Sequence, residues 1–287
     1  IMLAIQGVRK SFHLGTVNEK IALSNLNLQL KKGDYVTVIG GNGSGKSTLL
    51  NCIAGVYGVE QGEIVVDDQN VTKCSEHRRA KFLGRVFQDP MVGTSAQMSI
   101  EENLAIALRR GQRRRLTWGI SAAERSLFKK ALGMLDLGLD ERLKTKAGLL
   151  SGGQRQALTL LMATLRKPKV LLLDEHTAAL DPKTASKVLE ITDRMIHEHE
   201  LTTLMITHNM QDAITYGNRL IMMHDGSIIL DIKGEAKQKL TVEHLVSRFS
   251  SWPQASLGKA QLDASVHTCV RDSPSISLTN FELCEGE

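Results

Sequence analysis

Short apolar runs recur along this chain, and their length predicts strands. Residues 35–40 (YVTVIG), 170–174 (VLLLD) and 202–208 (TTLMITH) are apolar or β-branched and are bounded by polar residues or glycine. Runs of this length and composition predict strands that are buried on both faces. Residues 26–30 (LNLQL) instead alternate apolar and polar positions, which predicts a strand with one exposed face.

Two further segments predict strands that turn back on themselves. Residues 63–71 (EIVVDDQNV) contain a polar turn inside an apolar pattern. Residues 219–232 (RLIMMHDGSIILDI) place Asp225 and Gly226 between two apolar halves. Because Asp-Gly suits a tight hairpin turn, the second segment predicts a β-hairpin.

Helical patterns lie between these strands. Residues 49–55 (LLNCIAG) have helical spacing and end on glycine, as helices commonly do. Residues 181–200 also have helical spacing, with Asp181 suited to the N-cap and Pro182 to the first helical position. Strands that alternate with helices predict an α/β core with a largely parallel sheet.

One long stretch departs from this alternation. Residues 98–147 contain helical patterns at 100–108 (IEENLAIAL) and 123–139 (AERSLFKKALGMLDLGL) and no convincing strand. We therefore interpret 98–147 as a helical insertion between two parts of the α/β core, 1–97 and 148–232. Periodicity fades in 233–287, and the Ser-rich end of that extension predicts a poorly packed tail.

Composition narrows the class of protein. The chain has 287 residues, of which 42% are hydrophobic and 23% charged, and this balance is typical of a globular protein with a sizeable core. No stretch approaches the roughly 18 apolar residues that a membrane span needs. The four cysteines, Cys52, Cys74, Cys269 and Cys284, show no CxxC spacing. We expect reduced thiols rather than a zinc site or a disulfide framework.

The net charge of +5 has a local concentration at residues 109–115 (RRGQRRR). Such a run is usually a solvated face of a loop or helix. The alternative is contact with phosphate, from anionic lipid or from nucleic acid. No aromatic residues interleave with these arginines, which speaks against base stacking and against nucleic acid as the partner.

The strongest motif is GGNGSGKST at residues 40–48. It follows a predicted strand, precedes a predicted helix and satisfies G-x-x-x-x-G-K-[ST]. Glycines allow backbone N–H groups to surround phosphate oxygens at a helix N-terminus, whose dipole favours anions. Lys46 can reach the β- and γ-phosphates of a nucleotide, and the Ser47 hydroxyl can bind Mg²⁺.

Two adjacent acids end the strand predicted at 170–174. At the carboxyl end of a buried strand, Asp174 can hold Mg²⁺ through water. Glu175 lies one residue later, so its side chain projects differently. That placement suits a base that polarises water for in-line attack on the γ-phosphate.

A second glycine-rich helix start occurs at residues 150–156 (LSGGQRQ). Ser151 and the backbone of Gly152 and Gly153 could donate hydrogen bonds to phosphate there. Since this chain already has one phosphate loop, we infer that the second glycine-rich helix start binds the nucleotide of another subunit. Two copies related by a twofold axis would then bind two nucleotides at their interface.

In this order, GGNGSGKS, LSGGQRQ, VLLLDE and the histidine of MITHN resemble the motifs of the ATP-binding-cassette (ABC) ATPases. The resemblance spans about residues 2–232, and LSGGQ separates this family from other P-loop enzymes. It implies a P-loop NTPase (RecA-like) α/β core with an antiparallel β subdomain and an inserted helical subdomain. It also implies ATP and Mg²⁺ as the bound groups.

The resemblance assigns further roles. Gln88 in VFQDP matches the Q-loop glutamine, which contacts Mg²⁺ or the attacking water. His208 matches the switch histidine, which touches the γ-phosphate and positions Glu175. Asp181 matches the aspartate at the subunit interface, and Phe12 matches the aromatic residue that stacks on adenine. Residues 98–147 correspond to the helical subdomain that receives a coupling helix of a membrane subunit.

The expected site therefore comprises three overlapping sets. The catalytic residues are Lys46, Gln88, Glu175 and His208. The metal-binding residues are Ser47, Gln88 and Asp174. The nucleotide-binding residues are Phe12, Gly40, Asn42, Gly43, Ser44, Gly45, Lys46, Ser47, Thr48, Ser151, Gly152, Gly153, Gln154 and Asp181.

The function that this resemblance implies is that of the nucleotide-binding subunit of an ABC transporter. Two copies would close on two Mg²⁺-ATP and drive a separate membrane permease from the cytoplasmic face of the inner membrane. DEHTAALDPKTA at 174–185 resembles a bacterial group of uptake systems with a lipoprotein-type binding protein. We therefore expect import, with an amino acid as the cargo and an extracytoplasmic substrate-binding protein as a further partner.

Other classes compete with this interpretation. Exporters and lipoprotein-release cassettes share the same core motifs. A soluble ABC ATPase acting on nucleic acid or ribosomes would usually carry two cassettes, long coiled coils or zinc modules, none of which this sequence shows. A P-loop kinase would not need LSGGQ.

His176 is the point where the chain departs from the family, which commonly has proline after the glutamate. Proline fixes φ and lacks an N–H, so histidine removes that restriction and adds a titratable group. We favour variation without a catalytic role, because His208 already matches the switch position.

Overall fold

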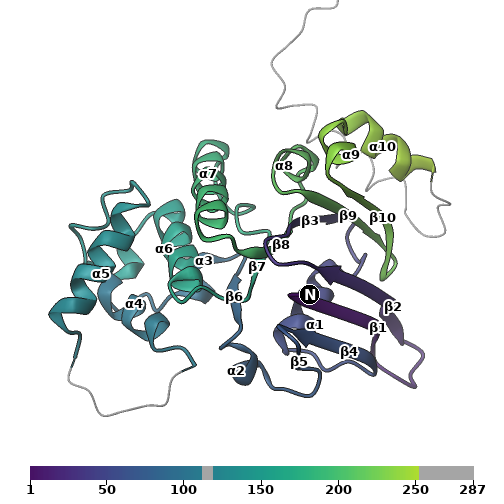
Figure 1. The fold of residues 1–287 in the computed structure, drawn as a ribbon, viewed down its shortest axis with the longest axis horizontal. Helices are drawn as coiled ribbons and strands as arrows, with labels where there is room; N and C mark the ends of the chain where they lie inside the picture. Colours follow the sequence, from purple (N-terminus) through teal and green to yellow (C-terminus); the bar gives the residue numbers. More distant parts are fainter. Residues whose placement is uncertain (112–118, 252–287) are drawn as a thin grey trace, which may run out of the picture. The chain divides into compact units, whose positions relative to one another are not determined.

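The computed structural model describes residues 1–111 and 119–251 and divides the chain into two compact units, Ile1–Val242 and Glu243–Glu287. Figure 1 shows the fold. In the described residues, no helix combines the length and the apolar content that a membrane span requires.

A six-stranded sheet forms the centre of the first unit. Its order is β10 (Ser227–Lys233), β9 (Arg219–His224), β3 (Tyr35–Gly40), β8 (Thr202–Ile206), β7 (Val170–Asp174), β6 (Leu83–Val86). All neighbouring pairs are parallel except β9 and β10, which form an antiparallel hairpin. The three predicted buried strands and the predicted hairpin at Asp225 are therefore confirmed.

Strand β7 shows why these runs are apolar throughout. Its residues alternate between two buried clusters, with Leu171 and Leu173 in one and Val170 and Leu172 in the other. Both faces of the sheet are therefore covered, as parallel sheets require. Each fully buried aliphatic side chain of this kind stabilises the fold by about 2 kcal/mol relative to exposure.

A second, antiparallel sheet has the order β2 (Lys20–Leu30), β1 (Leu3–Phe12), β4 (Gln61–Val66), β5 (Gln69–Asn70). The predicted strand at 26–30 is part of β2, and the predicted turn in 63–71 joins β4 to β5. The antiparallel subdomain that the resemblance implied is thus present.

Two strands were not predicted from the sequence. In β1 the period-two pattern is interrupted, because Gly7 adopts φ +57° and the pairing with β2 shifts register on either side of Val8. In β6 only four residues (LGRV) form the strand, and one of them is Arg85. A pattern broken by a bulge, or one this short, does not show the periodicity on which prediction relies.

The helices are α1 (Lys46–Ala54), α2 (Glu76–Arg79), α3 (Pro90–Gly93), α4 (Ile100–Leu108), α5 (Ala122–Gly133), α6 (Gly152–Thr164), α7 (Pro182–His199), α8 (Met210–Thr215), α9 (Glu235–Gln238) and α10 (Val242–Ser251), with a 3-10 turn at Ala147–Leu149. Asp181 caps α7 by accepting from Thr184 N at 3.1 Å, and Pro182 is the first helical residue, as predicted. Helices α9 and α10 lie within residues 233–287, for which the sequence pattern predicted no regular elements.

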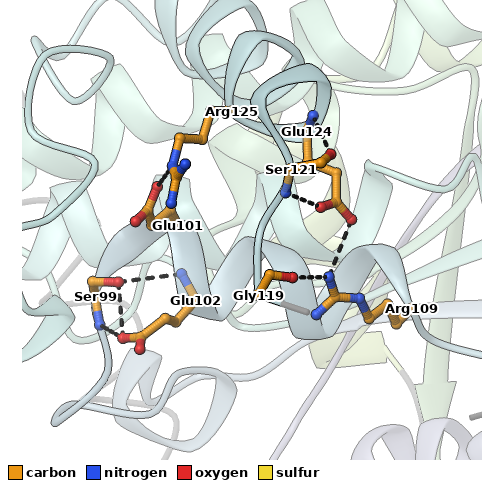
Figure 2. Close-up of polar contacts among 8 residues, drawn as sticks. All are labelled: Ser99, Glu101, Glu102, Arg109, Gly119, Ser121, Glu124 and Arg125. Carbon is orange, nitrogen blue, oxygen red and sulfur yellow. Dashed lines mark hydrogen bonds and ion pairs between the residues drawn. The ribbon is translucent and has the colours of Figure 1, made fainter. Parts of the chain in front are cut away.

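Helices α4 and α5 form the inserted segment, and polar contacts hold them together (Figure 2). Each begins with a capping box, Ser99 with Glu102 and Ser121 with Glu124, which satisfies N–H groups that a helix start leaves free. Between the helices, Arg125 Nε donates to Glu101 Oε2 at 2.8 Å. In Figure 1 this segment lies to the left, and β1, β2 and β4 lie to the right.

The end of the insertion differs from the prediction. Helix α5 stops at Gly133 instead of continuing to residue 139, and Asp136 and Gly138 adopt positive φ values of 53° and 64°. Two apolar residues of the remaining stretch still pack in the core, because Leu135 and Leu139 are fully buried. Burial without helical backbone explains why the helical spacing was misleading.

The basic run at 109–115 lies partly outside the described residues. Its two described arginines contact the chain itself: Arg109 Nη2 donates to Gly119 O at 2.9 Å, and Arg110 Nη2 donates to Ala163 O at 3.0 Å. Residues 112–115, the Ser-rich tail after residue 251, Cys269 and Cys284 lie outside the described residues.

Candidate functional site

The glycine-rich loop at residues 40–48 joins β3 to α1. Gly45, at φ +98°, is the N-cap of α1, and a Cβ there would lie 2.4 Å from Ala22 O. A Cβ on Gly40 would meet Met223 O at 2.4 Å and Ser44 Oγ at 2.7 Å. Only glycine fits either position, and it allows the backbone to curve tightly between β3 and α1.

A cavity of about 380 Å³ lies against this loop. Its lining includes these predicted site residues: Phe12, Asn42, Gly43, Ser44, Gly45, Lys46, Ser47, Thr48, Gln88 and Glu175. Lys20 and Ala22 of β2 also line it and were not predicted, since no sequence motif marks a strand that reaches the site only through the tertiary fold. Gly40, Asp174 and His208 are not in the lining.

Lys46 is the first residue of α1 and is only 7% exposed. Its Nζ donates to Gly40 O at 2.7 Å and to Gly41 O at 3.0 Å. Burial lowers the pKa of Lys46, and the carboxylates of Glu175 and Asp174 counter that effect. The ammonium group is therefore held at the loop that would receive phosphate.

Phe12 ends β1 at the cavity. Its ring meets Tyr57 edge-to-face with the ring centroids 5.3 Å apart, and Lys10 Nζ lies 5.3 Å from the centroid of the Phe12 ring. These contacts fix an aromatic surface beside the glycine-rich loop, as a ring that stacks on a nucleobase requires.

The acids at the end of β7 diverge as predicted. Asp174 still follows the ladder, paired with Ile206, whereas Glu175 turns into the left-handed region at φ 44°. Asp174 Oδ2 lies 3.6 Å from Arg85 Nη2, and Glu175 Oε2 lies 3.8 Å from His208 Nδ1. The change in backbone direction thus gives two neighbouring carboxylates different partners.

Electrostatics distinguishes the two acids further. The contact with His208 holds the pKa of Glu175 below its usual range, and the same contact raises the pKa of His208. Burial raises the pKa of Asp174, and the positive charge of Arg85 opposes that effect. Glu175 is therefore maintained as a carboxylate beside the cavity.

His176 points away from this chemistry. The side chain is buried and its Nε2 lies 3.1 Å from Thr192 Oγ1 of α7. Because the Thr192 hydroxyl donates to Val188 O at 2.8 Å, it accepts from Nε2–H, which assigns the tautomer of His176. Burial lowers the pKa of His176 to about 4, so the ring is neutral near pH 7. The expectation of a non-catalytic histidine agrees with this placement.

The second glycine-rich helix start belongs to α6. Ser151 Oγ accepts from Gln154 N at 3.3 Å, and Gln154 Oε1 accepts from Ser151 N at 3.2 Å. A Cβ on Gly153 would lie 2.2 Å from Thr184 Cγ2, so glycine allows α6 and α7 to pack closely. The cavity of the same chain is not lined by this helix start (Ser151, Gly152, Gly153 and Gln154) or by Asp181.

The chemistry of the donors suits Mg²⁺. Within the described ranges, no group of three or more His, Cys, Asp and Glu residues could hold a metal by itself. Ser47, Gln88 and Asp174 instead offer hydroxyl, amide and carboxylate oxygens near the phosphate loop, the hard ligands that Mg²⁺ takes together with substrate phosphates. The residues present therefore fit this metal in company with a nucleotide.

The fold and these groups define a class of protein. A glycine-rich loop with a lysine at the start of α1, an acidic pair at the end of β7 and a histidine facing the second acid form the site of a P-loop nucleoside triphosphatase.

Comparisons with known proteins place the chain within that class. A family model described as ABC transporter matches residues 23–178. A tyrosine transport ATP-binding protein of Clostridioides difficile is 44% identical over 248 residues, 86% of this chain and 98% of that protein. An aliphatic sulfonates import ATP-binding protein of Bacillus cereus is 35% identical over 77% of this chain and 80% of that protein.

A solved structure shows the same fold. The dimeric structure of an ATP-binding cassette in a post-hydrolysis state, bound to ADP and Pi, superposes with a TM-score of 0.69 and 28% identity over 81% of this chain and 98% of that chain. The chain belongs to the ABC transporter family. It is an ATP-binding cassette that hydrolyses ATP for transport, which confirms the predicted fold class and enzymatic activity.

Burial of His176 predicts a pH-dependent stability. Below an unfolded-state pKa of about 6.5 the unfolded chain takes up a proton on this histidine that the folded chain does not, so the folded state loses stability as the pH falls from 6.5 toward 4. We expect His176→Gln to remove up to about 3 kcal/mol of that loss, measured by urea unfolding at each pH.

His77→Gln, at an exposed position, is the matched control for replacing a histidine by glutamine. Equal pH dependence in wild type and His176→Gln would contradict the assignment of His176 as a buried, neutral group.

Proposed function

We propose that this chain is the ATP-hydrolysing subunit of an importer, in which two copies bind two Mg²⁺-ATP and act on a separate permease at the cytoplasmic face of the membrane. The observation that carries the proposal is the contact between Glu175 and His208 at the edge of a glycine-lined phosphate site. Support for import comes from the name of the aliphatic sulfonates import relative.

The binding step follows from the cavity. Phe12 would stack on adenine, and the backbone N–H groups of residues 40–48 would donate to the phosphates. Lys46 would exchange its bonds to Gly40 O and Gly41 O for bonds to the β- and γ-phosphates. Ser47, Gln88 and Asp174 would hold Mg²⁺, which supplies positive charge to those phosphates when bound.

The hydrolytic step is assigned to Glu175. Its carboxylate, whose pKa the contact with His208 lowers, would accept a proton as water attacks the γ-phosphorus in line with the leaving ADP oxygen. His208 is 63% exposed at its side chain, so it can donate to the γ-phosphate as well as orient Glu175. Most of the rate enhancement would come from such positioning and from charge stabilisation.

The proposal of a dimer follows from a phosphate-suited helix start that does not line the cavity of its own chain. Ser151, Gly152, Gly153 and Gln154 form a helix start that is suited to phosphate, and they lie outside the cavity of their own chain. If two copies face each other, this helix start and Asp181 of one copy would lie against the nucleotide bound by the other copy. The dimeric state of the related cassette bound to ADP and Pi supports this arrangement.

The permease would dock beside Gln88. Four apolar side chains near the Q-loop and the helical insertion are exposed: Met91, Val92, Met98 and Leu149. Exposed apolar side chains grouped in this way suit a protein partner. We further propose an amino acid as the cargo, recognised by the permease and an extracytoplasmic binding protein, on the basis of the tyrosine transport relative.

Glu175→Gln tests the hydrolytic role. Removing the general base should lower ATP turnover at least about 100-fold. ATP binding should persist and ATP-bound dimers should accumulate, as measured by phosphate release and by size-exclusion chromatography. Glu190→Gln, at an exposed position on α7, is the matched control and should hydrolyse ATP normally. Wild-type turnover in Glu175→Gln would remove Glu175 from this role.

Mixed dimers test whether each nucleotide is bound by Lys46 of one copy and Ser151 of the other. Lys46→Ala and Ser151→Arg should each inactivate both sites of a homodimer. A 1:1 mixture should recover about a quarter of wild-type turnover, because half of the dimers are mixed and each of those has one intact composite site. No recovery, with mixed dimers demonstrated by differential tagging, would contradict the dimer proposed here.

Uptake measurements test import and the cargo. Replacing the native gene by the Glu175→Gln form should abolish energised uptake of a labelled aromatic amino acid, and the tagged chain should co-purify with a permease in mild detergent. Glu190→Gln again serves as the control. Undiminished uptake would contradict the proposed cargo, and labelled amino acid accumulating inside the mutant cells would indicate export.

A further inference from the structure

Arg85 lies at the site, although no sequence motif includes it. It is part of the edge strand β6, and its side chain is 14% exposed. Its Nη2 donates to Asn51 Oδ1 at 2.8 Å and lies 3.6 Å from Asp174 Oδ2. Its Cζ stands 4.5 Å from the centroid of the Phe87 ring. One guanidinium group therefore meets three different segments of the site.

Each of these contacts fixes the position of Arg85. Asn51 belongs to α1, the helix that begins with Lys46. Phe87 immediately precedes Gln88, and its carbonyl oxygen accepts from Gln156 Nε2 of α6 at 3.0 Å. The ring beneath the guanidinium is thus anchored to a second helix. Arg85 cannot move away from Asp174 without losing its hydrogen bond to the Asn51 side-chain amide and its stacking on the Phe87 ring.

Arg85 places a positive charge beside the predicted metal ligand Asp174. In the described part of the chain, Arg85 is the one residue that forms an ion pair with Asp174. A carboxylate suited to a divalent cation is therefore already paired with a cation. A positive charge 3.6 Å from this oxygen repels a second cation there, and partial burial weakens the screening by water.

We propose that Arg85 is the resident counter-cation of Asp174 and makes metal binding at this carboxylate depend on the nucleotide. This inference rests on the proposed function, in which Asp174 holds Mg²⁺. Without phosphate, the charge of Asp174 is balanced by Arg85 and a divalent ion gains little there. Phosphate oxygens add the negative charge that outweighs the repulsion from Arg85, so metal and nucleotide bind together.

Binding of Mn²⁺ to the full-length, nucleotide-free protein tests this role, with electron paramagnetic resonance as the readout. Arg85→Gln retains an amide that can donate to Asn51 but removes the charge, and we expect its Mn²⁺ affinity to rise at least about tenfold. Arg85→Lys, which keeps the charge, should stay close to wild type. Adding Asp174→Asn to Arg85→Gln should abolish the gain.

Equal affinity in wild type, Arg85→Gln and Arg85→Lys would overturn the proposal, and so would a gain that persists without Asp174. Binding of a fluorescent ATP analogue in EDTA reports folding of each variant. Arg85→Met, a second uncharged replacement, carries the same prediction if Arg85→Gln does not fold.

A separate measurement isolates the role of Asp174. If the single variant Asp174→Asn keeps the wild-type stimulation of ATP binding by Mg²⁺, then the proposed metal role of Asp174 is wrong. If that stimulation is lost while removal of the Arg85 charge has no effect on Mn²⁺ binding, only the inference about Arg85 is wrong.

Discussion

The site depends on one constraint, the parallel register of three central strands. Strand β8 pairs Ile206 with Val38 of β3 on one side and with Asp174 of β7 on the other. Parallel strands end at the same edge of a sheet, so the glycine-rich loop, the two acids and His208 emerge together. Apolar burial on both faces holds that register, because a slip would move core side chains out of both clusters.

The charged side chains at this edge of the sheet are each held by a partner within the protein. Lys46 is held by two backbone carbonyls, Asp174 by Arg85, and Glu175 by His208. Each of these charged groups therefore has a partner inside the protein. A buried charge without such a partner would cost several kcal/mol, so pairing permits a polar site within a close-packed fold.

Prediction from the sequence succeeded where local chemistry decides. Gly45 and Gly40 occupy positions where a Cβ would collide with backbone, and Asp181 and Pro182 start α7 by capping and by a fixed φ. It failed where distant contacts decide. Strand β1 is interrupted by a bulge and is completed by its partners, and Leu135 and Leu139 are buried in a segment that is not helical. Their apolar spacing did not indicate which backbone would bury them.

The sequence by itself determined the phosphate loop, the acidic pair, the second helix start and the family, because each is encoded in consecutive residues whose conformation is locally restricted. Only the tertiary structure decided the surroundings of those residues. The tertiary structure directs the His176 side chain into the core, where it contacts Thr192. It also brings Lys20 to the cavity and places Arg85 beside Asp174. His176 and Thr192 are 16 positions apart, and Arg85 and Asp174 are 89 positions apart. Such contacts depend on side-chain direction across packed elements, which no local pattern encodes.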